Sequence, residues 1–411
     1  MTSPPPPAPA GGLAPVPVRT VVVLGLLSTF GPLSLDLYLP ALPSLATDLA
    51  TTTSSAQLSI TACLIGLATG QLVAGPMSDR YGRRRPLVIG LALYLLSSAA
   101  CAVAPSIEVL LALRLLQGLA GSAGIVIARA VARDLFSGRV LLVVFARLML
   151  VSGMAPIAAP VLGGQLSRVM SWRGIFWCLA AVGVALLACG LFGLPESHPA
   201  SRRTTGGLAA TLHGFRRLLR DRPFVAVVTS SGLAAASLFA YIAGATFVLQ
   251  RIYGLSATGF SLVFGSNAVG ILLLSQLGAM LARRGWPALR VMAIGIVINL
   301  VGALTLCVVV VAHLSLSAIL TALFVMVAAL GFVFPTATTL AMSDHPDQAG
   351  AASSLLGMGQ FVLGGVVAPL VGLRGEESAV PLGVVALACS LLGAVLFFAV
   401  ARPAMRGHRP E

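Results

Sequence analysis

No charged side chain occurs between residues 291 and 343, where the sequence reads VMAIGIVINLVGALTLCVVVVAHLSLSAILTALFVMVAALGFVFPTATTLAMS. A helix that crosses a hydrocarbon core of about 30 Å needs about 20 mostly apolar residues. The stretch is therefore long enough for two crossings, and His313 lies near the expected turn between them. This part of the chain predicts an integral membrane protein.

The rest of the chain is almost as apolar. Of its 411 residues, 58% are hydrophobic and 9% are charged, and the mean hydropathy is +0.99, whereas a soluble domain carries about 25% charged residues. The sequence therefore predicts an all-α membrane protein with twelve transmembrane helices. We expect them at roughly 20–46, 56–78, 86–105, 108–133, 141–167, 173–195, 223–250, 257–282, 290–312, 315–342, 348–373 and 379–402.

The basic residues are distributed unevenly between the two sides of the membrane. All 26 are arginine, and because twelve crossings bring both termini to one side, 19 of the 26 fall on that side. Cytoplasmic loops are enriched in basic residues, so we predict a multi-pass membrane protein with both termini in the cytoplasm. The absence of lysine suggests a bacterial source and hence the cytoplasmic (inner) membrane. The formal net charge of +14 then favours anionic membrane lipids as partners and argues against nucleic acid.

A polar segment at 196–222 divides the helices six and six, and sequence repeats support this division. GPMSDRYG at 75–82 recurs as GAMLARRG at 278–285, and APVLG at 159–163 recurs as APLVG at 368–372. Two same-sense repeats are typical of transporters whose halves rock about a central site. The expected parts are a disordered Pro-rich tail at 1–18, a six-helix bundle at 19–195, a cytoplasmic linker at 196–222, a second bundle at 223–403 and a cytoplasmic tail at 404–411.

Several functions are excluded by residues that the sequence lacks. Without lysine there is no P-loop of the GxxxxGK[ST] type and no Schiff base. The six cysteines lie singly in apolar segments and the five histidines lie at loops or helix ends, so we expect no metal and no cofactor. The chain has no HExxH motif, no paired intramembrane carboxylates and no filter-like loop, which argues against an enzyme and a channel.

Asp36 and Arg114 are charged residues that lie inside predicted spans. Asp36 occurs in FGPLSLDLYLPALP at 30–43, and such a group costs roughly 2.5–3.5 kcal/mol on insertion scales unless it faces a cavity or partner. We expect it to exchange the coupling proton, the alternative being a later helix start that leaves Asp36 at the surface. Arg114 occurs in LLALRLLQGLAGSAG at 110–124, with Gln117 on the same face. It would either pair with Asp36 or extend to the outer surface.

Two further stretches combine glycines with other residues at defined spacing. The loop GPMSDRYGRRRP at 75–86 carries one aspartate and four arginines, and a simple topogenic loop is the alternative interpretation. The stretch GMAPIAAPVLGG at 153–164 contains two prolines that kink a helix and glycines that allow close packing. Here the alternative is a kinked helix that serves only packing.

The loop resembles the signature loop of the major facilitator superfamily. The resemblance implies the major facilitator fold, with two pseudo-symmetric six-helix bundles, and a latch that stabilises the outward-facing state. Its members here would be Gly75, Asp79, Arg80, Gly82, Arg83, Arg84 and Asp134. The run around Arg114 resembles the fourth-helix motif of this superfamily, whose arginine is associated with proton transfer.

The stretch at 153–164 is similar to the antiporter motif of drug exporters. Pro160, Gly163 and Gly164 match the motif, Ala155 and Ala159 replace its other glycines, and Gly153 and Pro156 complete the stretch. Further runs are similar to the Bcr/CflA drug-resistance branch: DLYLPALP at 36–43, ARAVARD at 128–134, FVLQRIYGLS at 247–256, FGSNAVG at 264–270, GFVFPTATTLAM at 331–342 and AGAASSLLGMGQF at 349–361.

These resemblances cover residues 20–400 and imply a drug and proton antiporter. Its substrates would be small amphiphilic compounds such as chloramphenicol, bicyclomycin or sulfonamides. A proton-coupled importer of a small metabolite is the alternative function. We expect a monomer, because two repeats build a central site without a partner. Polar residues inside the helices would line the cavity or merely join helices; the candidates are Asp36, Tyr38, Gln117, Tyr241 and Asn267.

Overall fold

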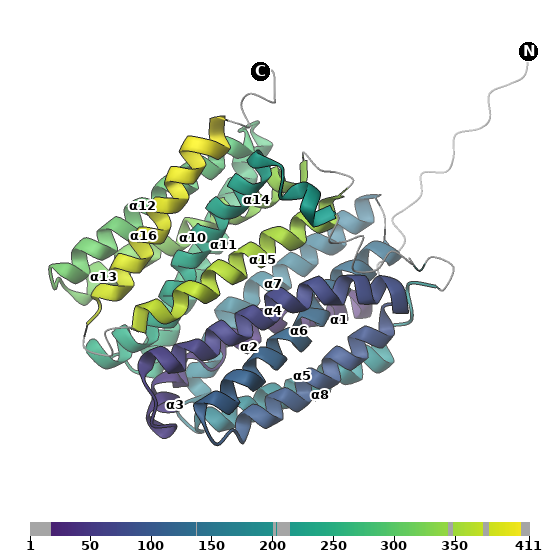
Figure 1. The fold of residues 1–411 in the computed structure, drawn as a ribbon, viewed down its shortest axis with the longest axis horizontal. Coiled ribbons are helices and arrows are strands. Elements are labelled where there is room, and N and C mark those ends of the chain that lie inside the picture. The colour runs from purple at the N-terminus through teal and green to yellow at the C-terminus, as the bar shows by residue number, and fades with distance from the viewer. Residues whose placement is uncertain are drawn as a thin grey trace, which may run out of the picture.

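A computed structural model describes residues 18–136, 138–199, 203, 214–343, 348–372 and 378–403, and the regular structure in these ranges is entirely helical (Figure 1). The first half contains α1 (Val18–Leu27), α2 (Phe30–Asp36), η1 (Leu39–Ala41), α3 (Leu42–Asp48), α4 (Thr53–Tyr81), α5 (Arg84–Ala102), α6 (Ile107–Leu135), α7 (Gly138–Leu166) and α8 (Trp172–Gly193). The second half contains α10 (Arg222–Phe247), η3 (Val248–Ile252), α11 (Ala257–Arg283), α12 (Ala288–Val311), α13 (Leu316–Ala328), α14 (Leu330–Ser343), α15 (Ala349–Val367), η5 (Ala368–Gly372), α16 (Val380–Leu396) and η6 (Phe397–Ala401).

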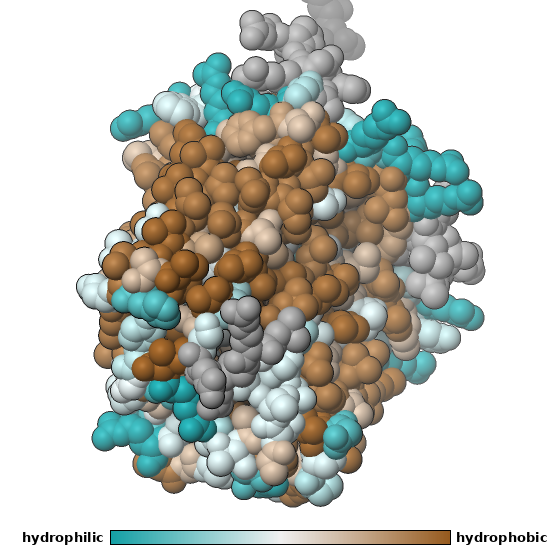
Figure 2. All heavy atoms as spheres, turned by 60° about the vertical axis from the view of Figure 1, so that its left-hand side comes forward, coloured by the Kyte–Doolittle hydropathy of each residue, from teal (hydrophilic) through white to brown (hydrophobic). Residues whose placement is uncertain are grey.

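The predicted membrane crossings are present. Among the described residues, 10 helices are long and apolar enough to cross a membrane. The broken segment from α1 to α3 and the 29-residue α7 supply the other two predicted crossings. Figure 2 shows a broad apolar surface with hydrophilic residues gathered toward its margins, as expected for a protein whose sides face lipid. Residues 1–17 of the predicted tail at 1–18, the tail at 404–411, and residues 200–202 and 204–213 of the predicted linker lie outside the described residues.

The six-helix sets form two bundles that lie side by side (Figure 1). Within the first bundle α4 packs on α6 and α5 on α8, and within the second α10 packs on α15 and α16. Between the bundles, α7 contacts α11 and α4 contacts α15. We call the end of the molecule at which α1 begins and η6 ends the terminal end, and the opposite end, with α3 and η3, the far end.

The internal repeat extends to backbone conformation. The hydroxyl of Thr52 accepts a hydrogen bond from Ser55 N at the start of α4, and the hydroxyl of Ser256 accepts one from Gly259 N at the start of α11. Such caps satisfy a free N–H of the first turn. After the same helices, Gly82 and Gly285 have φ values of +88° and +82°, which glycine adopts without the penalty of a side chain. The equivalent helices α4 and α11 therefore begin with the same kind of hydroxyl cap, and each is followed by a glycine with positive φ.

The first crossing is not the single helix predicted for residues 20–46. It consists of α1, α2, η1 and α3, with breaks after Leu27 and Asp36. Pro40 and Pro43 lack the N–H that would continue the hydrogen-bond ladder, so the chain changes direction just beyond Asp36. The tenth crossing, predicted at 315–342, is likewise divided at Ala329 into α13 and α14.

Glycines bring the backbones of α4 and α6 into contact. A Cβ added at Gly66 would lie less than 3.0 Å from the Leu115 carbonyl oxygen, and one added at Gly118 would lie equally close to the Cys63 carbonyl oxygen. Small residues at helix interfaces permit such approach in membrane proteins. This contact places Arg114 of α6 beside the backbone of α4.

Candidate functional site at the interface of the two bundles

Asp36 is the last residue of α2 and is 5% exposed. Its carboxylate makes no hydrogen bond or ion pair with another described residue. The helix α2 packs against α4, α6 and α7 of its own bundle. The segment η1, which begins three residues after Asp36, contacts α10 and α11 of the second bundle. The predicted intramembrane carboxylate is therefore buried where the two bundles meet.

Tyr241 belongs to a polar and aromatic group in the second bundle. Its hydroxyl accepts a hydrogen bond of 2.8 Å from Asn267 Nδ2, and its ring stacks on Phe264 at a centroid distance of 5.4 Å. Tyr241 and Asn267 are 1% and 2% exposed. Of the residues predicted for the cavity, the structure thus brings Tyr241 and Asn267 into contact with each other.

Arg114 is not paired with Asp36 in this structure. It is fully buried inside the first bundle, where its guanidinium donates to Gln117 Oε1, to the Ser34 carbonyl oxygen (2.9 Å) and to the Ser59 carbonyl oxygen (3.4 Å). The ring of Tyr38 lies 4.5 Å from its central carbon. Neutral acceptors and an aromatic face therefore take the place of the expected carboxylate. The alternative in which Arg114 extends to the outer surface does not fit its burial.

Tyr38 and Gln117, which we also predicted for the cavity, lie inside the first bundle. The Tyr38 hydroxyl is hydrogen-bonded to Ser59 Oγ at 2.9 Å. Gln117 Nε2 donates to Ser98 Oγ at 2.7 Å while its oxygen accepts from Arg114. Both side chains are fully buried. In this structure Tyr38 connects the segment between α2 and η1 to α4, and Gln117 connects α6 to α5, rather than facing the second bundle.

The paired glycines of the antiporter-like stretch face two different neighbours. All five motif residues from Gly153 to Gly164 lie on α7. A Cβ on Gly163 would lie less than 3.0 Å from the Leu37 carbonyl oxygen, directly after Asp36. A Cβ on Gly164 would come equally close to Ser261 Oγ of α11. Gly163 therefore allows the broken first crossing to pack closely against α7, and Gly164 allows α11 of the second bundle to do the same.

Three of the residues predicted for the latch, Asp79, Arg83 and Asp134, form a cluster at the terminal end with Arg83 at its centre. The Arg83 guanidinium donates to Asp134 Oδ2 at 2.8 Å and also pairs with Asp79. Burial alone would lower the pKa of Arg83, but its hydrogen bonds to Asp134 and Asp79 outweigh burial and raise it. Arg80 instead is exposed and lies over the Tyr81 ring, 5.3 Å from its centroid. The sequence predicts the same role for Arg80 as for Arg83, and the exposure of Arg80 argues against that role.

Sequence reasoning missed two residues of this cluster, Glu196 and Ser197, which follow α8. Glu196 accepts hydrogen bonds from the backbone N–H groups of Arg83 (2.8 Å) and Arg84 (3.2 Å). A carboxylate at these groups caps the start of α5 and complements its dipole. Ser197 Oγ donates to Asp134 Oδ2 at 3.0 Å. The only local sequence signal for this cluster is the acidic residue Glu196 just after a predicted span. That signal does not reveal that its partners, Arg83 and Arg84, lie more than a hundred positions earlier in the sequence.

Polar side chains join the two bundles at the far end. Each donates to a backbone carbonyl of the other bundle: Ser54 to Pro369 (3.2 Å), Gln57 to Ala243 (3.1 Å), Thr61 to Gly365 (2.7 Å), Gln250 to Pro40 (3.2 Å) and Arg251 to Pro43 (3.3 Å). The acceptors Pro40 and Pro43 lie in the proline-broken part of the first crossing. The far end is thus closed in this structure.

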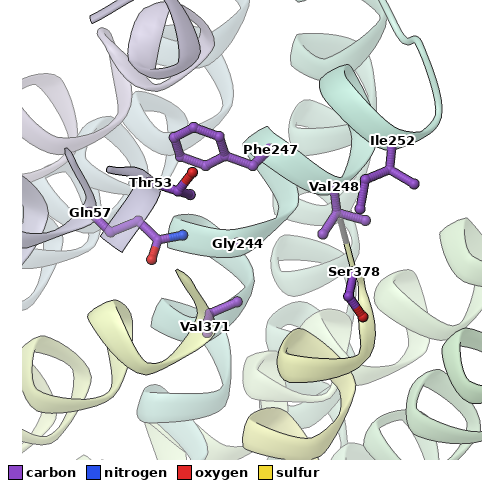
Figure 3. Close-up of a pocket in the computed structure, with 8 residues that line it drawn as sticks. All are labelled: Thr53, Gln57, Gly244, Phe247, Val248, Ile252, Val371 and Ser378. Carbon is purple, nitrogen blue, oxygen red and sulfur yellow. The ribbon is translucent and has the colours of Figure 1, made fainter. Parts of the chain in front are cut away.

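A small pocket remains within this closed region. Figure 3 shows Gln57 pointing into it beside Thr53, Gly244, Phe247, Val248, Ile252, Val371 and Ser378. Its volume of about 10 Å³ admits about one water molecule. The buried Gln57 Oε1 has no hydrogen-bond partner among the described residues, and it could accept a hydrogen bond from a water molecule in this pocket. No group of His, Cys, Asp and Glu in the described ranges could hold a metal ion.

Comparison with known proteins supports the sequence resemblance. The family model described as Major Facilitator Superfamily matches residues 24–369. The chain is 37% identical to an uncharacterized MFS-type transporter of Bacillus subtilis, YdgK, over 92% of this chain and 94% of that one. It is 27% identical to a bicyclomycin resistance protein homolog of Haemophilus influenzae (92% and 95% covered) and 31% identical to a chloramphenicol resistance protein of Pseudomonas aeruginosa (68% and 66% covered).

Solved structures share the fold at low sequence identity. A bacterial homolog of the human lysosomal transporter Spinster, in an inward-facing conformation, has a TM-score of 0.74 at 14% identity and covers 97% of this chain and 100% of its own. The Escherichia coli xylose transporter XylE, in a partially occluded inward-open conformation, has a TM-score of 0.71 at 15% identity, with 93% and 97% covered.

Proposed function

Because the chain belongs to the major facilitator superfamily and resembles its Bcr/CflA-type branch, we propose that it is a proton-coupled multidrug efflux transporter. Members of this superfamily are multi-pass membrane transporters of small molecules, not enzymes. The proposal adds the direction of transport, the coupling to protons and the cargo, which is a class of small amphiphilic compounds such as chloramphenicol or bicyclomycin. Two of the relatives are named for resistance to these compounds.

The observation that carries proton coupling is the burial of Asp36 without a partner. A carboxylate in a low-dielectric site is stable when it holds a proton or meets a cation. Asp36 lies just before η1, which contacts α10 and α11 of the second bundle, at the interface that would open when the bundles rock. It can therefore take up a proton in one state of the transporter and release it when cargo binds in the other.

The closed far end gives the orientation of the cycle. With both termini in the cytoplasm, as the arginine distribution favours, the far end faces outward and this structure is closed to the outside. Rocking would break the hydrogen bonds of the far end and expose Asp36 to the outer solution. The ion pairs of Arg83 with Asp79 and Asp134 lie within the first bundle and are already formed in this structure, so we propose that they stabilise that bundle during rocking, with α7 and its glycines as one of the moving interfaces.

Proton release on cargo binding tests the proposal. Chloramphenicol, bicyclomycin, a sulfonamide and ethidium are added in turn to weakly buffered, detergent-solubilised protein, and released protons are read with a pH indicator. We expect at least one compound to release protons from the wild type and from Glu108→Gln, an exposed carboxylate at the start of α6. We expect no release from Asp36→Asn. Release that persists in Asp36→Asn would remove Asp36 from the coupling, and no release by any compound would overturn proton antiport.

Direction is tested separately in membrane vesicles. An acid-inside pH gradient in inside-out vesicles is expected to drive accumulation of the active compound, which corresponds to export from the cell. Accumulation driven by the opposite gradient in right-side-out vesicles would instead assign the protein to proton-coupled uptake.

A further inference from the structure

We propose that the loop between α11 and α12, residues 284–287, binds an anionic phospholipid together with the two helix ends beside it. The arginine distribution favours anionic lipids as partners in general, and the structure indicates one place for them. Because α11 begins after η3 at the far end, this loop lies at the terminal end. The inference concerns the surface that faces the membrane, so it does not depend on the transported cargo.

Three arginines at this loop form no ion pair with a described residue. Arg283 is the last residue of α11, Arg284 follows it, and Arg290 lies in the first turn of α12. All three are exposed. No aspartate or glutamate occurs in the sequence between residues 222 and 343, and the C-terminus of a helix carries only about half a negative charge. A net positive charge therefore remains at this surface.

The equivalent loop of the first half neutralises its buried arginine internally. Arg83 pairs there with Asp79 and Asp134. In the repeat of GPMSDRYG as GAMLARRG, Ala282 stands at the position of Asp79. The second loop therefore has basic residues without this acidic partner, and its positive charge can attract an external anion.

The second loop is also less covered than the first. A Cβ on Gly82 would lie less than 3.0 Å from Glu196 and Arg203, which follow α8. A Cβ on Gly285, which has a similar positive φ, would meet no atom of a described residue within 4 Å. A lipid headgroup can therefore approach the second loop, whereas the chain itself covers the first.

Backbone hydrogen bonds hold Trp286 beside these arginines. Gly285 N donates to the Ala282 carbonyl oxygen at 3.0 Å and Trp286 N donates to the Leu281 carbonyl oxygen at 3.1 Å, which is the pattern of a Schellman motif. Trp286 is 44% exposed. Because tryptophan is enriched at the level of lipid headgroups, this residue indicates that the loop lies in the membrane interface.

An exposed apolar stripe on α12 leads from this loop toward the far end. Its residues follow one another at steps of three or four: Ile294, Val297, Val301, Leu304 and Val308. Arg290 is the next exposed residue on the same face. At 1.5 Å per residue, the distance from Arg290 to the far end of the stripe is about 27 Å, close to the thickness of a hydrocarbon core.

The stripe and the arginines together match the two parts of a phospholipid. An acyl chain can lie along the apolar face of α12 while the phosphate lies at the arginines. Guanidinium groups bind phosphate through paired, charge-assisted hydrogen bonds. A lipid with net negative charge is favoured over a zwitterionic one, because the choline group of the latter would be repelled by the same arginines.

Fluorescence quenching by spin-labelled lipids tests this inference on the full-length protein in nanodiscs of neutral lipid. Phosphatidylglycerol and phosphatidylcholine, each with a doxyl group near the headgroup end of one acyl chain, are compared as quenchers. The signal of Trp286 is the difference between the wild type and Trp286→Phe. We expect half-quenching at a mole fraction of phosphatidylglycerol at least about fivefold lower than that of phosphatidylcholine. This preference should weaken as the salt concentration is raised.

Two variants with the same change in net charge distinguish a local site from general attraction. The loop variant replaces the three arginines described above: Arg283→Gln, Arg284→Gln and Arg290→Gln. The control variant replaces three exposed arginines that precede α10: Arg216→Gln, Arg217→Gln and Arg220→Gln. The loop variant should lose the preference for phosphatidylglycerol and the control variant should keep it. Ala282→Asp retains every arginine and should weaken the preference, so the test does not depend on the folding of the loop variant.

Two outcomes would overturn the inference. Equal quenching by the two lipids would mean that the arginines are neutralised within the protein, for instance by Asp344, which lies outside the described residues. Loss of the preference in the control variant to the same extent as in the loop variant would mean that the lipid responds to the total charge of the protein and not to this loop.

Discussion

Gly163 of α7 lies against Leu37, so closely that a Cβ at position 163 would stand less than 3.0 Å from the Leu37 carbonyl oxygen. Leu37 follows Asp36 directly, at the point where the first crossing breaks. The contact therefore joins the helix that resembles the antiporter motif to the segment that carries the buried carboxylate. It gives a packing reason for a glycine at this position.

We expect Gly163→Ala to destabilise the protein by about 1–3 kcal/mol, as overpacking of a close interface does, and to reduce transport. The added methyl group meets backbone, which cannot rotate away. Gly31→Ala is the matched control, because its Cβ would meet only Ile125 Cδ1 at 3.6 Å, an ordinary contact. Thermal unfolding in detergent and drug efflux in cells measure the two effects. Equal behaviour of the two variants would show that the Gly163 contact is not required.

The sequence predicts the crossings, the repeat and the location of the buried acid, because each depends on local composition. Long uncharged runs specify helices in a membrane whatever their neighbours. The match between GPMSDRYG and GAMLARRG predicts equivalent turns, and Gly82 and Gly285 indeed share a positive φ. Asp36 stands out because a carboxylate inside an apolar span is costly.

The partners of these residues could not be predicted in the same way. Arg80 and Arg83 have identical chemistry, and the fact that α4 continues to Tyr81 decides which of them turns toward Asp134. The orientation of Arg114 depends on the rotation of α6 and on acceptors from Ser34 and Ser59, which no spacing reveals. Long-range contacts of this kind depend on how helices pack, not on their composition.

Arg83 and Arg80 should respond very differently to substitution. Arg83 is 6% exposed and pairs with both Asp79 and Asp134, and hydrogen bonds to charged groups contribute about 1.5–3 kcal/mol. We expect Arg83→Gln to lower the free energy of unfolding by about that amount, because it leaves two carboxylates without their cation. Arg80→Gln should change it little, since surface charges contribute about 0–1 kcal/mol.

Thermal unfolding of the two arginine variants, purified in the same detergent, checks this difference. A drug-resistance assay on the same variants reports whether the latch also affects transport. If Arg80→Gln proved the more damaging substitution, the Arg83 cluster would not be the structural centre of the loop.

The contact of Glu196 with the start of α5 should make stability depend on pH. Burial raises the pKa of Glu196, but hydrogen bonds from the backbone N–H groups of His198, Arg83 and Arg84, together with the charge of Arg203, outweigh it and hold the pKa below the usual value. A lowered carboxyl pKa stabilises the folded state fully above the unfolded-state pKa of about 4.3. This contribution is lost as the pH falls through the lower, folded-state pKa.

We therefore expect Glu196→Gln to be less stable than the wild type at pH 6 and the difference to shrink between pH 5 and pH 3. The effect should be small, because the side chain is exposed. Unfolding midpoints recorded across this range measure it, and Asp221→Asn provides a second linker carboxylate for comparison. A difference that grew as the pH fell would contradict the assigned contact.

Gln57 should help to hold the far end closed. It is 1% exposed, its Nε2 donates to the Ala243 carbonyl oxygen of the other bundle, and its Oε1 faces the small pocket of Figure 3. Gln57→Leu removes this hydrogen bond while keeping a side chain of similar size. Since a hydrogen bond contributes about 0.5–1.5 kcal/mol, the population open at the far end should rise about two- to tenfold.

Distances between spin labels at the far end measure that population. Labels on Val109→Cys of α6 and Leu314→Cys, before α13, occupy exposed positions in different bundles, in a background without the six native cysteines. The distance distribution should shift toward longer values in Gln57→Leu and stay unchanged in Gln276→Leu, an exposed glutamine of α11. Because rocking toward the outward-open state must break the Gln57 contact, an unchanged distribution in Gln57→Leu would mean that the closure of the far end depends on the remaining donors, Ser54, Thr61, Gln250 and Arg251.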